Sequence, residues 1–294
     1  MDNFIVLYNP LAGNGTAQDK MRELESLMQG DRLYFSNMLD IRDYGAFFND
    51  MPDGASIIIC GGDGTLNRFL NDTEDIRPDC DIYYYPSGSG NDFARDIGAE
   101  RGAPPVLINR YIERLPKICV NGKEHRFING IGYGIDGYCC EKGDELRGKG
   151  NGEVNYTAIA IKGLLFHYKP TGATITVDGV EHRFEKVWLA PTMIGRYYGG
   201  GMMPTPEQDR LNGDGAVSVM VYYGSGKLKS LAVFPSIFKG EHIKHSEMVA
   251  VLSGRNITVC FDEPRPLQID GETVPGVREY SVRKRFCSRR DTMV

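Results

Sequence analysis

The stretch of sequence that decides the fold of the first half of the chain is SIIICGGDGTLNRFL, residues 56–70. It opens with the apolar run Ile57–Cys60, which predicts a short buried strand. Two glycines, an aspartate, a third glycine and a threonine follow, and then a segment that can form a helix. A strand that leads through a glycine-rich turn into a helix presents backbone N–H groups to phosphate, so the stretch predicts a phosphate site.

Asp63 is the unexpected residue of this turn, because its carboxylate would repel a bare phosphate. A carboxylate beside phosphates is favoured when a cation lies between the two groups. The stretch therefore predicts a site for a nucleotide with bound Mg²⁺, and Asp63 as a ligand of the metal.

Two further glycine-rich turns follow predicted strands on either side of this stretch. Phe4–Tyr8 is followed by NPLAGNG at residues 9–15, and Asp81–Tyr85 by PSGSGNDFARDIG at residues 86–98. Repeated strand–turn–helix units predict a parallel sheet whose ligands gather at the carboxyl ends of the strands. Taken alone, the turn at residues 9–15 is better explained as an ordinary strand-to-helix connection.

The pattern changes near residue 120, where short strands joined by glycine turns begin. Asn121-Gly122 and Asp178-Gly179 predict hairpins. We predict a nucleotide-binding α/β domain at residues 1–120 and a mostly antiparallel β-sandwich at residues 121–294, with a last segment that can return to the first domain. The charged, glycine-rich stretch 141–153 predicts an exposed loop.

Composition excludes several classes of protein. The net charge of −5 argues against a protein that coats nucleic acid. Seven cysteines without CxxC spacing predict reduced thiols, as in a cytoplasmic protein. The first ten residues, MDNFIVLYNP, lack the features of a secretory signal, and no apolar run reaches the ~18–20 residues of a membrane span.

The motifs of the common nucleotide-binding folds are absent, because the chain has no GxxxxGK[ST] P-loop and no GxGxxG after its first strand. A different ordered set is present and resembles the diacylglycerol kinase catalytic-domain family, most closely its bacterial soluble lipid kinases. The set comprises GGDGTLN at 61–67, PSGSGNDFAR at 86–95, NGIGYGIDG at 129–137, YYGGGMMPTPEQDRLNGDGAVSV at 197–219 and IDGE at 269–272.

The resemblance implies an NAD-kinase-like first domain that binds ATP at the carboxyl ends of its strands, between the domains. Ser89 stands where the family usually has threonine, which keeps the hydroxyl and loses a methyl group. The residues implied to contact the nucleotide are Asn9, Gly13, Gly61, Gly62, Asp63, Gly64, Thr65, Leu66, Asn67, Ser89 and Asn91.

The resemblance also implies the catalytic residues. Asp63 would hold the catalytic Mg²⁺, Asp92 and Asp136 match acidic residues of the same network, and Glu272 would accept the proton of the acceptor hydroxyl. The residues alone favour simpler explanations, because Asp92 can cap a helix and Glu272 follows an Asp-Gly pair typical of turns.

A second metal site is implied at Asp214, where family members bind a structural Mg²⁺ with the backbone carbonyls of Leu211 and Ala216. Ligation by oxygen atoms alone suits Mg²⁺. The sequence Asn-Gly-Asp-Gly around Asp214 is equally typical of a plain hairpin turn.

The function implied is an ATP- and Mg²⁺-dependent lipid kinase that phosphorylates a hydroxyl group, with diacylglycerol as the expected acceptor and phosphatidic acid as the product. An NAD kinase, a sphingosine- or ceramide-type kinase and a non-catalytic nucleotide-binding regulator are the alternatives. A lipid acceptor implies transient contact with a membrane surface and no nucleic-acid partner, and relatives are often homodimers. The basic tail at residues 283–290 is more simply explained as solvated than as a membrane anchor.

Overall fold

The computed structural model describes residues 2–10, 17–76, 78–88, 90–148, 159, 162–163 and 167–283. Among the residues singled out above, Gly13 and Ser89 lie outside this description. So do most of the apolar segment 154–166 and the tail beyond Arg283. The chain divides into two compact units, Met1–Glu113 and Arg114–Val294.

The first unit is built on a five-stranded sheet with the strand order β2-β1-β3-β4-β5. The first four strands are parallel to one another, as the repeated strand–turn–helix pattern predicts, and β5 is antiparallel to β4. The strands are β1 (Asn3–Tyr8), β2 (Arg32–Asn37), β3 (Ser56–Gly61), β4 (Ile82–Pro86) and β5 (Val106–Leu107).

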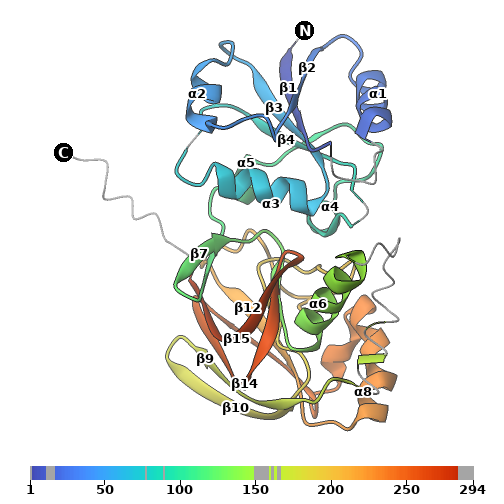
Figure 1. The fold of residues 1–294 in the computed structure, drawn as a ribbon, viewed down its shortest axis with the longest axis vertical. Coiled ribbons are helices and arrows are strands. Elements are labelled where there is room, and N and C mark those ends of the chain that lie inside the picture. Colours follow the sequence, from blue (N-terminus) through green and yellow to red (C-terminus); the bar gives the residue numbers. More distant parts are fainter. Residues whose placement is uncertain are drawn as a thin grey trace, which may run out of the picture. The chain divides into compact units, whose positions relative to one another are not determined.

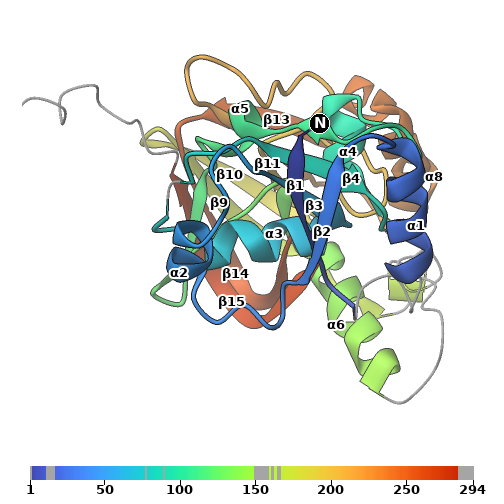
Figure 2. The same cartoon turned by 90° about the horizontal axis from the view of Figure 1, so that it is seen from above.

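Helices lie on both faces of this sheet. Right-handed crossovers between parallel strands place α1 on one face and α2 and α3 on the other, and Figures 1 and 2 show α1 and α2 on opposite sides of the strands. The helices are α1 (Ala17–Leu27), α2 (Tyr44–Asn49), α3 (Asp63–Asp72), α4 (Asp92–Ile97) and α5 (Asn109–Ile112).

The second unit is built on antiparallel strands, as the glycine turns predict. Its central path runs β13-β12-β11-β8-β14-β15-β6-β7, with the β9–β10 hairpin paired to β14 (Figure 1). The strands are β6 (Lys117–Val120), β7 (Lys123–Arg126), β8 (Gly130–Tyr133), β9 (Thr171–Val177), β10 (Val180–Val187), β11 (Thr192–Met193), β12 (Val217–Tyr222), β13 (Val249–Gly254), β14 (Asn256–Ile269) and β15 (Glu272–Arg283).

Strand β14 is the longest of these and is shared between two neighbours. Its first half, 257–261, pairs with β9, and its last three residues, 267–269, pair with β8. The register against β15 shifts between Cys260 and Leu267, as at a β-bulge. Beyond this shift the end of β14 lies alongside β8.

The helices of the second unit whose bounds are described are α6 (Ile135–Gly148), α8 (Lys227–Val233) and the 3₁₀ helices η3 (Phe234–Lys239) and η4 (Glu241–Lys244). The prediction of an exposed loop at residues 141–153 is wrong for residues 141–148, which belong to α6. Residues 149–153 lie outside the described residues. The hydroxyl of Thr273 on β15 donates to the carboxylate of Asp144 at 2.7 Å, which ties this helix to the sheet. Within the described part of the chain, no helix is both long and apolar enough to cross a membrane.

Candidate active site

The carboxyl ends of β1, β3 and β4 lie at one edge of the first sheet. Tyr8 is in register with Cys60, and Gly61 with Pro86. Because the three strands are parallel, the residues that follow them, including Asn9 and Gly62, emerge at the same edge. The structure thus brings the three predicted glycine-rich turns to one place, as far as their residues are described.

The turns after β3 and β4 pack directly against each other through their glycines. A Cβ atom on Gly88 would lie 2.4 Å from the Cα of Gly62, which no side chain can occupy. The N–H of Ser87 donates to the carbonyl of Gly61 at 2.9 Å and locks the two turns together. The two turns therefore form one continuous backbone surface, and a side chain at Gly88 would force them apart.

Helix α3 starts within this surface. Its N-cap residue is Gly62, which makes no side-chain capping bond, and an added Cβ at Gly64 would meet nothing within 4 Å. The side chains of Thr65 and Leu66 are buried, and their N–H groups donate to the carbonyl of Gly62 at 3.0 and 3.2 Å. The backbone of residues 62–64 is consequently the part of this turn that an anion can approach.

The carboxylate of Asp63 spans from the start of α3 to the start of α4. It accepts hydrogen bonds from the N–H of Asp92 at 2.8 Å and from the N–H of Phe93 at 3.2 Å. The α4 N-cap residue, Asn91, makes no side-chain capping bond, so Asp63 performs this task from the neighbouring helix.

Asp92 is buried, with 6% of its surface exposed, and it is the first residue of α4 rather than its N-cap. The hydroxyl of Tyr84 is buried nearby and has no hydrogen-bond partner among the described residues. Burial, with added repulsion from Asp63 and Asp92, raises the pKa of this hydroxyl well above its ordinary value. The carboxylates of Asp63 and Asp92 supply the negative charge and the oxygen ligands that suit a divalent cation.

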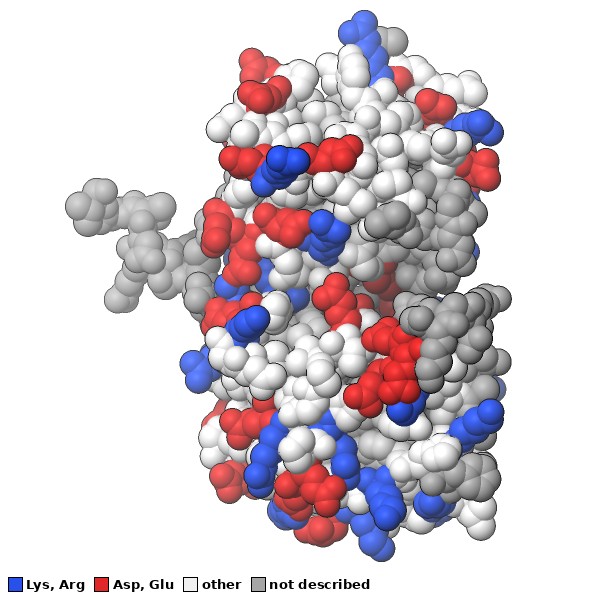
Figure 3. Space-filling view, in the orientation of Figure 1, with Lys and Arg blue, Asp and Glu red and all other residues white. Residues whose placement is uncertain are grey.

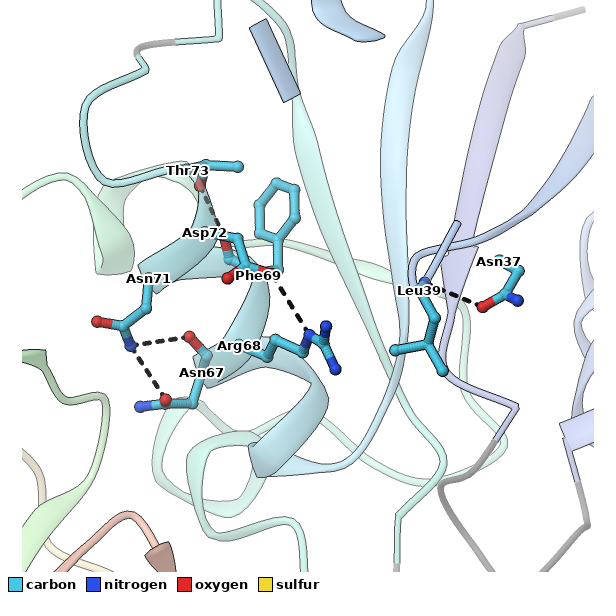
Figure 4. Close-up of polar contacts among 8 residues, drawn as sticks. All are labelled: Asn37, Leu39, Asn67, Arg68, Phe69, Asn71, Asp72 and Thr73. Carbon is cyan, nitrogen blue, oxygen red and sulfur yellow. Dashed lines mark hydrogen bonds and ion pairs between the residues drawn. The ribbon is translucent and has the colours of Figure 1, made fainter. Parts of the chain in front are cut away.

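The side chain of Asn67 lies one turn further along α3. It accepts a hydrogen bond from the amide of Asn71 at 3.0 Å, and the neighbouring pair Arg68–Asp72 lies 3.4 Å apart on the helix surface (Figure 4). The contact of Asn67 with a nucleotide stays a prediction. The side chain of Asn67 is already hydrogen-bonded to Asn71 of the same helix.

In the second unit, Glu272 begins β15 directly after the turn Asp270-Gly271. Both turn residues have positive φ, 46° and 96°, as a type I′ hairpin turn requires. Glu272 is exposed and lies opposite Ile269 in the ladder. The Asp-Gly pair therefore forms a turn, as the residues alone indicate, and the carboxylate of Glu272 directly after it is exposed to solvent.

Asp270 anchors this turn, a role that the sequence reading missed. Its carboxylate accepts three backbone hydrogen bonds, from Ile128 at 2.6 Å, Asn129 at 2.9 Å and Gly130 at 3.0 Å. The guanidinium of Arg210 also reaches this segment, donating to the carbonyl of Ile128 and to the side chain of Asn129. An aspartate two residues before a candidate base was the only sequence signal for this anchor.

Replacing Asp270 with alanine is expected to lower the free energy of unfolding by about 2–4 kcal/mol, because three backbone donors lose a charged acceptor. Denaturant unfolding measures this change. Asp262→Ala is the control, since it removes a carboxylate of an exposed ion pair with Arg183 and should cost no more than ~1 kcal/mol. Equal losses for the two variants would contradict the anchoring role.

Asp136 is joined to the same turn through Gln268. The amide nitrogen of Gln268 donates to Asp136 Oδ2 at 2.9 Å, and its amide oxygen accepts from the N–H of Gly271 at 2.5 Å. A Cβ atom on Gly132 would lie 1.5 Å from the same carboxylate oxygen, so only glycine fits there. The structure thus links Asp136 by two hydrogen bonds to Gly271, the residue before Glu272.

Burial raises the pKa of Asp136 from its ordinary value near 3.8 to about 6, an effect that Gln268 and Tyr198 only partly offset. The folded protein therefore holds a proton here that the unfolded chain releases, so stability falls as the pH rises from about 4 to 6. We expect Asp136→Asn to be more stable than the native chain at pH 8 by up to about 3 kcal/mol, and equal to it below pH 4. Unfolding of both in denaturant without Mg²⁺ at the two pH values measures this; a pH-independent difference would contradict it.

The predicted metal turn at Asp214 is closed by hydrogen bonds of its own. Asp214 Oδ1 accepts from the N–H of Ala216 at 3.0 Å, and the carbonyl of Ala216 accepts from the amides of Gln208 and Asn212 at 3.0 and 2.7 Å. The oxygen donors suit Mg²⁺. Both lone pairs of the Ala216 carbonyl are already used, however, so Mg²⁺ would have to displace an amide donor there.

No three His, Cys, Asp or Glu side chains cluster as a metal site in the part of the chain that the structure describes. Any metal bound by these residues would therefore complete its shell with backbone, water or ligand oxygens, which Mg²⁺ commonly does. Asp63 with Asp92 in one unit and Asp214 in the other remain the candidates.

Comparison with known proteins identifies both units. Residues 3–117 match the family model of the diacylglycerol kinase catalytic domain, and residues 129–282 match that of the YegS C-terminal NAD kinase beta sandwich-like domain. A diacylglycerol kinase of Mycobacterium tuberculosis is 26% identical over 235 residues, which cover 75% of this chain and 74% of the relative. One of Bacillus subtilis is 29% identical over 224 residues, 74% and 70% of the two chains.

A solved structure shares the whole fold. The crystal structure of a diacylglycerol kinase from Bacillus anthracis superposes with a TM-score of 0.58 and 19% identity, covering 96% of this chain and 93% of the other. The two matched models account for both units, and the glycine-rich surface with Asp63 lies within the first. The chain therefore belongs to the lipid kinase family that is defined by the diacylglycerol kinase catalytic domain.

Proposed function

We propose that this lipid kinase transfers the γ-phosphoryl group of ATP, with Mg²⁺, to the free hydroxyl of diacylglycerol and so forms phosphatidic acid. The observation that carries the proposal is the backbone surface of residues 61–64 and 86–88, with the carboxylate of Asp63 at its edge. Such a surface provides donors for phosphate oxygens and a ligand for the metal that accompanies them. The names of the matched relatives supply the class of acceptor.

Phosphoryl transfer needs positioning and charge neutralisation more than covalent chemistry from the protein. The N-terminus of α3 holds the phosphates, because its first-turn backbone is open and its dipole favours an anion. Asp63 and Asp92 would hold the Mg²⁺, which neutralises the phosphate charge when bound. Because Asp63 also holds the start of α4, the metal ligand is fixed in place before any metal arrives.

Glu272 is proposed as the base that takes the proton of the acceptor hydroxyl. It follows the turn Asp270-Gly271, and both turn residues are held in place. The carboxylate of Asp270 accepts backbone N–H groups, and the amide oxygen of Gln268 accepts the N–H of Gly271. A base positioned by its neighbours need not be buried, since geometry comes before pKa in selecting the group that takes a proton. Asp136 supports this turn through Gln268 rather than by touching the acceptor.

Incubation of the purified chain with γ-labelled ATP, Mg²⁺ and a total lipid extract tests the proposal. Labelled phosphatidic acid is the expected product, identified by chromatography and mass. Label in phosphorylated sphingoid bases or ceramide would move the acceptor to another lipid. A parallel reaction with NAD tests for an NAD kinase, and ATP binding without any labelled product would indicate a non-catalytic regulator.

We propose separately a structural Mg²⁺ at Asp214, with the carbonyls of Leu211 and Ala216 as its other protein ligands and with one amide donor of the Ala216 carbonyl displaced when the metal binds. We expect 5 mM Mg²⁺, roughly 100 times an assumed Kd, to stabilise the native chain by about 2.7 kcal/mol and to leave Asp214→Ala unchanged. Thermal unfolding with and without Mg²⁺, in the absence of nucleotide, measures the difference. Glu207→Ala, which removes an exposed carboxylate of the same loop, is the control and should keep the Mg²⁺ effect. An Mg²⁺ effect that persists in Asp214→Ala would place the metal elsewhere.

A further inference from the structure

The segment formed by α8 and η3, residues 227–239, carries an apolar surface that the second unit does not cover. Leu228 is 80% exposed and Phe238 46% exposed, and both are among the most exposed large apolar residues of the described chain. Pro235 and Ala232 on the same segment are also exposed. Large apolar residues that gather on one exposed element mark an interaction site more often than isolated ones do.

Within each of the two helices the exposed apolar residues lie on one side. Ser230, Val233 and Ile237 are buried and attach the segment to the core of the second unit. Leu228 and Ala232 are four residues apart in α8, and Pro235 and Phe238 are three apart in a 3₁₀ helix, so each pair shares a face. The pattern is that of an amphipathic element with its apolar face left open.

The segment is firmly attached to the neighbouring loop at residues 202–206. The N–H of Met203 donates to the carbonyl of Ile237 at 3.0 Å, and the ring of the buried His242 donates from Nε2 to the carbonyl of Pro204 at 2.9 Å. The open apolar face is therefore presented on a fixed support and is not a loose end of the chain.

Lysines border this face. Residues 227–247 contain four lysines and two glutamates, a formal charge of +2 within a chain of net charge −5. The lysines are Lys227 and Lys229 on either side of Leu228, Lys239 next to Phe238, and Lys244 in η4. Lys229 pairs with Glu247 at 2.8 Å and Lys244 with Glu241 at 3.4 Å, so Lys227 and Lys239 account for the excess positive charge. In Figure 3, blue side chains lie among white ones over the end of the second unit that holds α8 in Figure 1.

We propose that the open face of α8 and η3 docks on the surface of an anionic phospholipid membrane. Leucine, phenylalanine and proline would enter the boundary between headgroups and acyl chains, and the lysines would lie at the level of the anionic headgroups. This inference rests on the proposed function, because a kinase of diacylglycerol finds its acceptor in a membrane. A second copy that docked through the same face would set its lysines against these lysines, so the lysine border favours an anionic lipid surface.

Sedimentation of the full chain with phospholipid vesicles tests the docking surface without any catalysis. Binding to vesicles of phosphatidylglycerol and phosphatidylcholine is expected to exceed binding to phosphatidylcholine alone. The variant L228S/F238S should lower the partition coefficient on the anionic vesicles by at least tenfold, and K227Q/K239Q by about tenfold or more at low salt. Two control variants, V180S and K123Q, change exposed residues at the starts of β10 and β7 and should bind as the native chain does.

A kinase assay separates failure of the docking surface from failure of the proposed function. With a short-chain, monomeric diacylglycerol the L228S/F238S variant should turn over at the native rate, and with vesicle-borne diacylglycerol it should be at least tenfold slower. If the native chain phosphorylates neither substrate, the proposed function is wrong, and the docking surface is then judged by the sedimentation result alone. Native vesicle binding by L228S/F238S, or a dimer in size-exclusion chromatography that this variant abolishes, would overturn the docking surface.

Discussion

Replacing Asp63 with asparagine is expected to lower the turnover of the kinase by roughly 10³-fold, because the metal loses a charged ligand where charge develops on the phosphates. The change also removes one of the two acceptors for the N–H groups of Asp92 and Phe93, since an amide has a single oxygen. We expect the free energy of unfolding to fall by about 1–3 kcal/mol as a result. Steady-state kinetics and denaturant unfolding of the same preparation measure the two effects.

Asp72→Asn is the matched control for this variant. Asp72 lies on the same helix, is 42% exposed and forms a surface pair with Arg68 at 3.4 Å, which is worth no more than ~1 kcal/mol. Its turnover should stay within twofold of the native value. If Asp63→Asn lost stability and kept its turnover, the aspartate would cap α4 and take no part in the chemistry.

Replacing Glu272 with glutamine is expected to lower turnover by about 10²–10⁴-fold, because the acceptor hydroxyl loses the group that takes its proton. The side chain is exposed and close in shape to glutamine, so stability should change by less than ~0.5 kcal/mol. Binding of ATP should also be unchanged, since the residue would act on the acceptor. Turnover, unfolding and equilibrium binding of ATP give the three values.

Glu279→Gln controls for the loss of an exposed carboxylate on the same strand and should turn over at the native rate. Retention of lipid phosphorylation by Glu272→Gln would remove this residue as the base. The Asp270→Ala variant adds a further comparison, because it leaves Glu272 in the chain and disturbs only the turn that holds it.

The sequence predicts the first unit well because its signals are local. A buried apolar run, a glycine turn and a helix start stand next to one another in residues 56–70, and they become β3, the turn at Gly62 and α3. The parallel order of β1, β3 and β4 follows from the repetition of that unit. The placement of the turns at one sheet edge then needs no further information.

The features that sequence reasoning missed depend on contacts between distant residues. Residues 141–148 look like a loop by composition, yet they are helical in α6, which Asp136 and Asp144 tie to the sheet through Gln268 and Thr273. Tertiary contacts of this kind routinely override local preference. The anchoring by Asp270 likewise joins groups about 140 residues apart, so no local pattern could reveal it.

The second role of Asp63, as the cap of α4, also depends on a contact between residues far apart in the sequence. The motif predicts a metal ligand, and only the structure shows that the carboxylate also receives two N–H groups of α4, some 30 residues away. The residue is therefore fixed by the fold as well as suited to the chemistry. A close similarity in motif cannot separate these two roles, whereas the control variants above can.

The most direct measurement is the rate at which the purified chain converts diacylglycerol in mixed micelles to phosphatidic acid with ATP and Mg²⁺. We expect a rate that is abolished by excess EDTA and restored by Mg²⁺, is lowered at least ~100-fold by Glu272→Gln, and exceeds any conversion of NAD to NADP. A chain that forms no phosphatidic acid under these conditions, or that phosphorylates NAD instead, would contradict it.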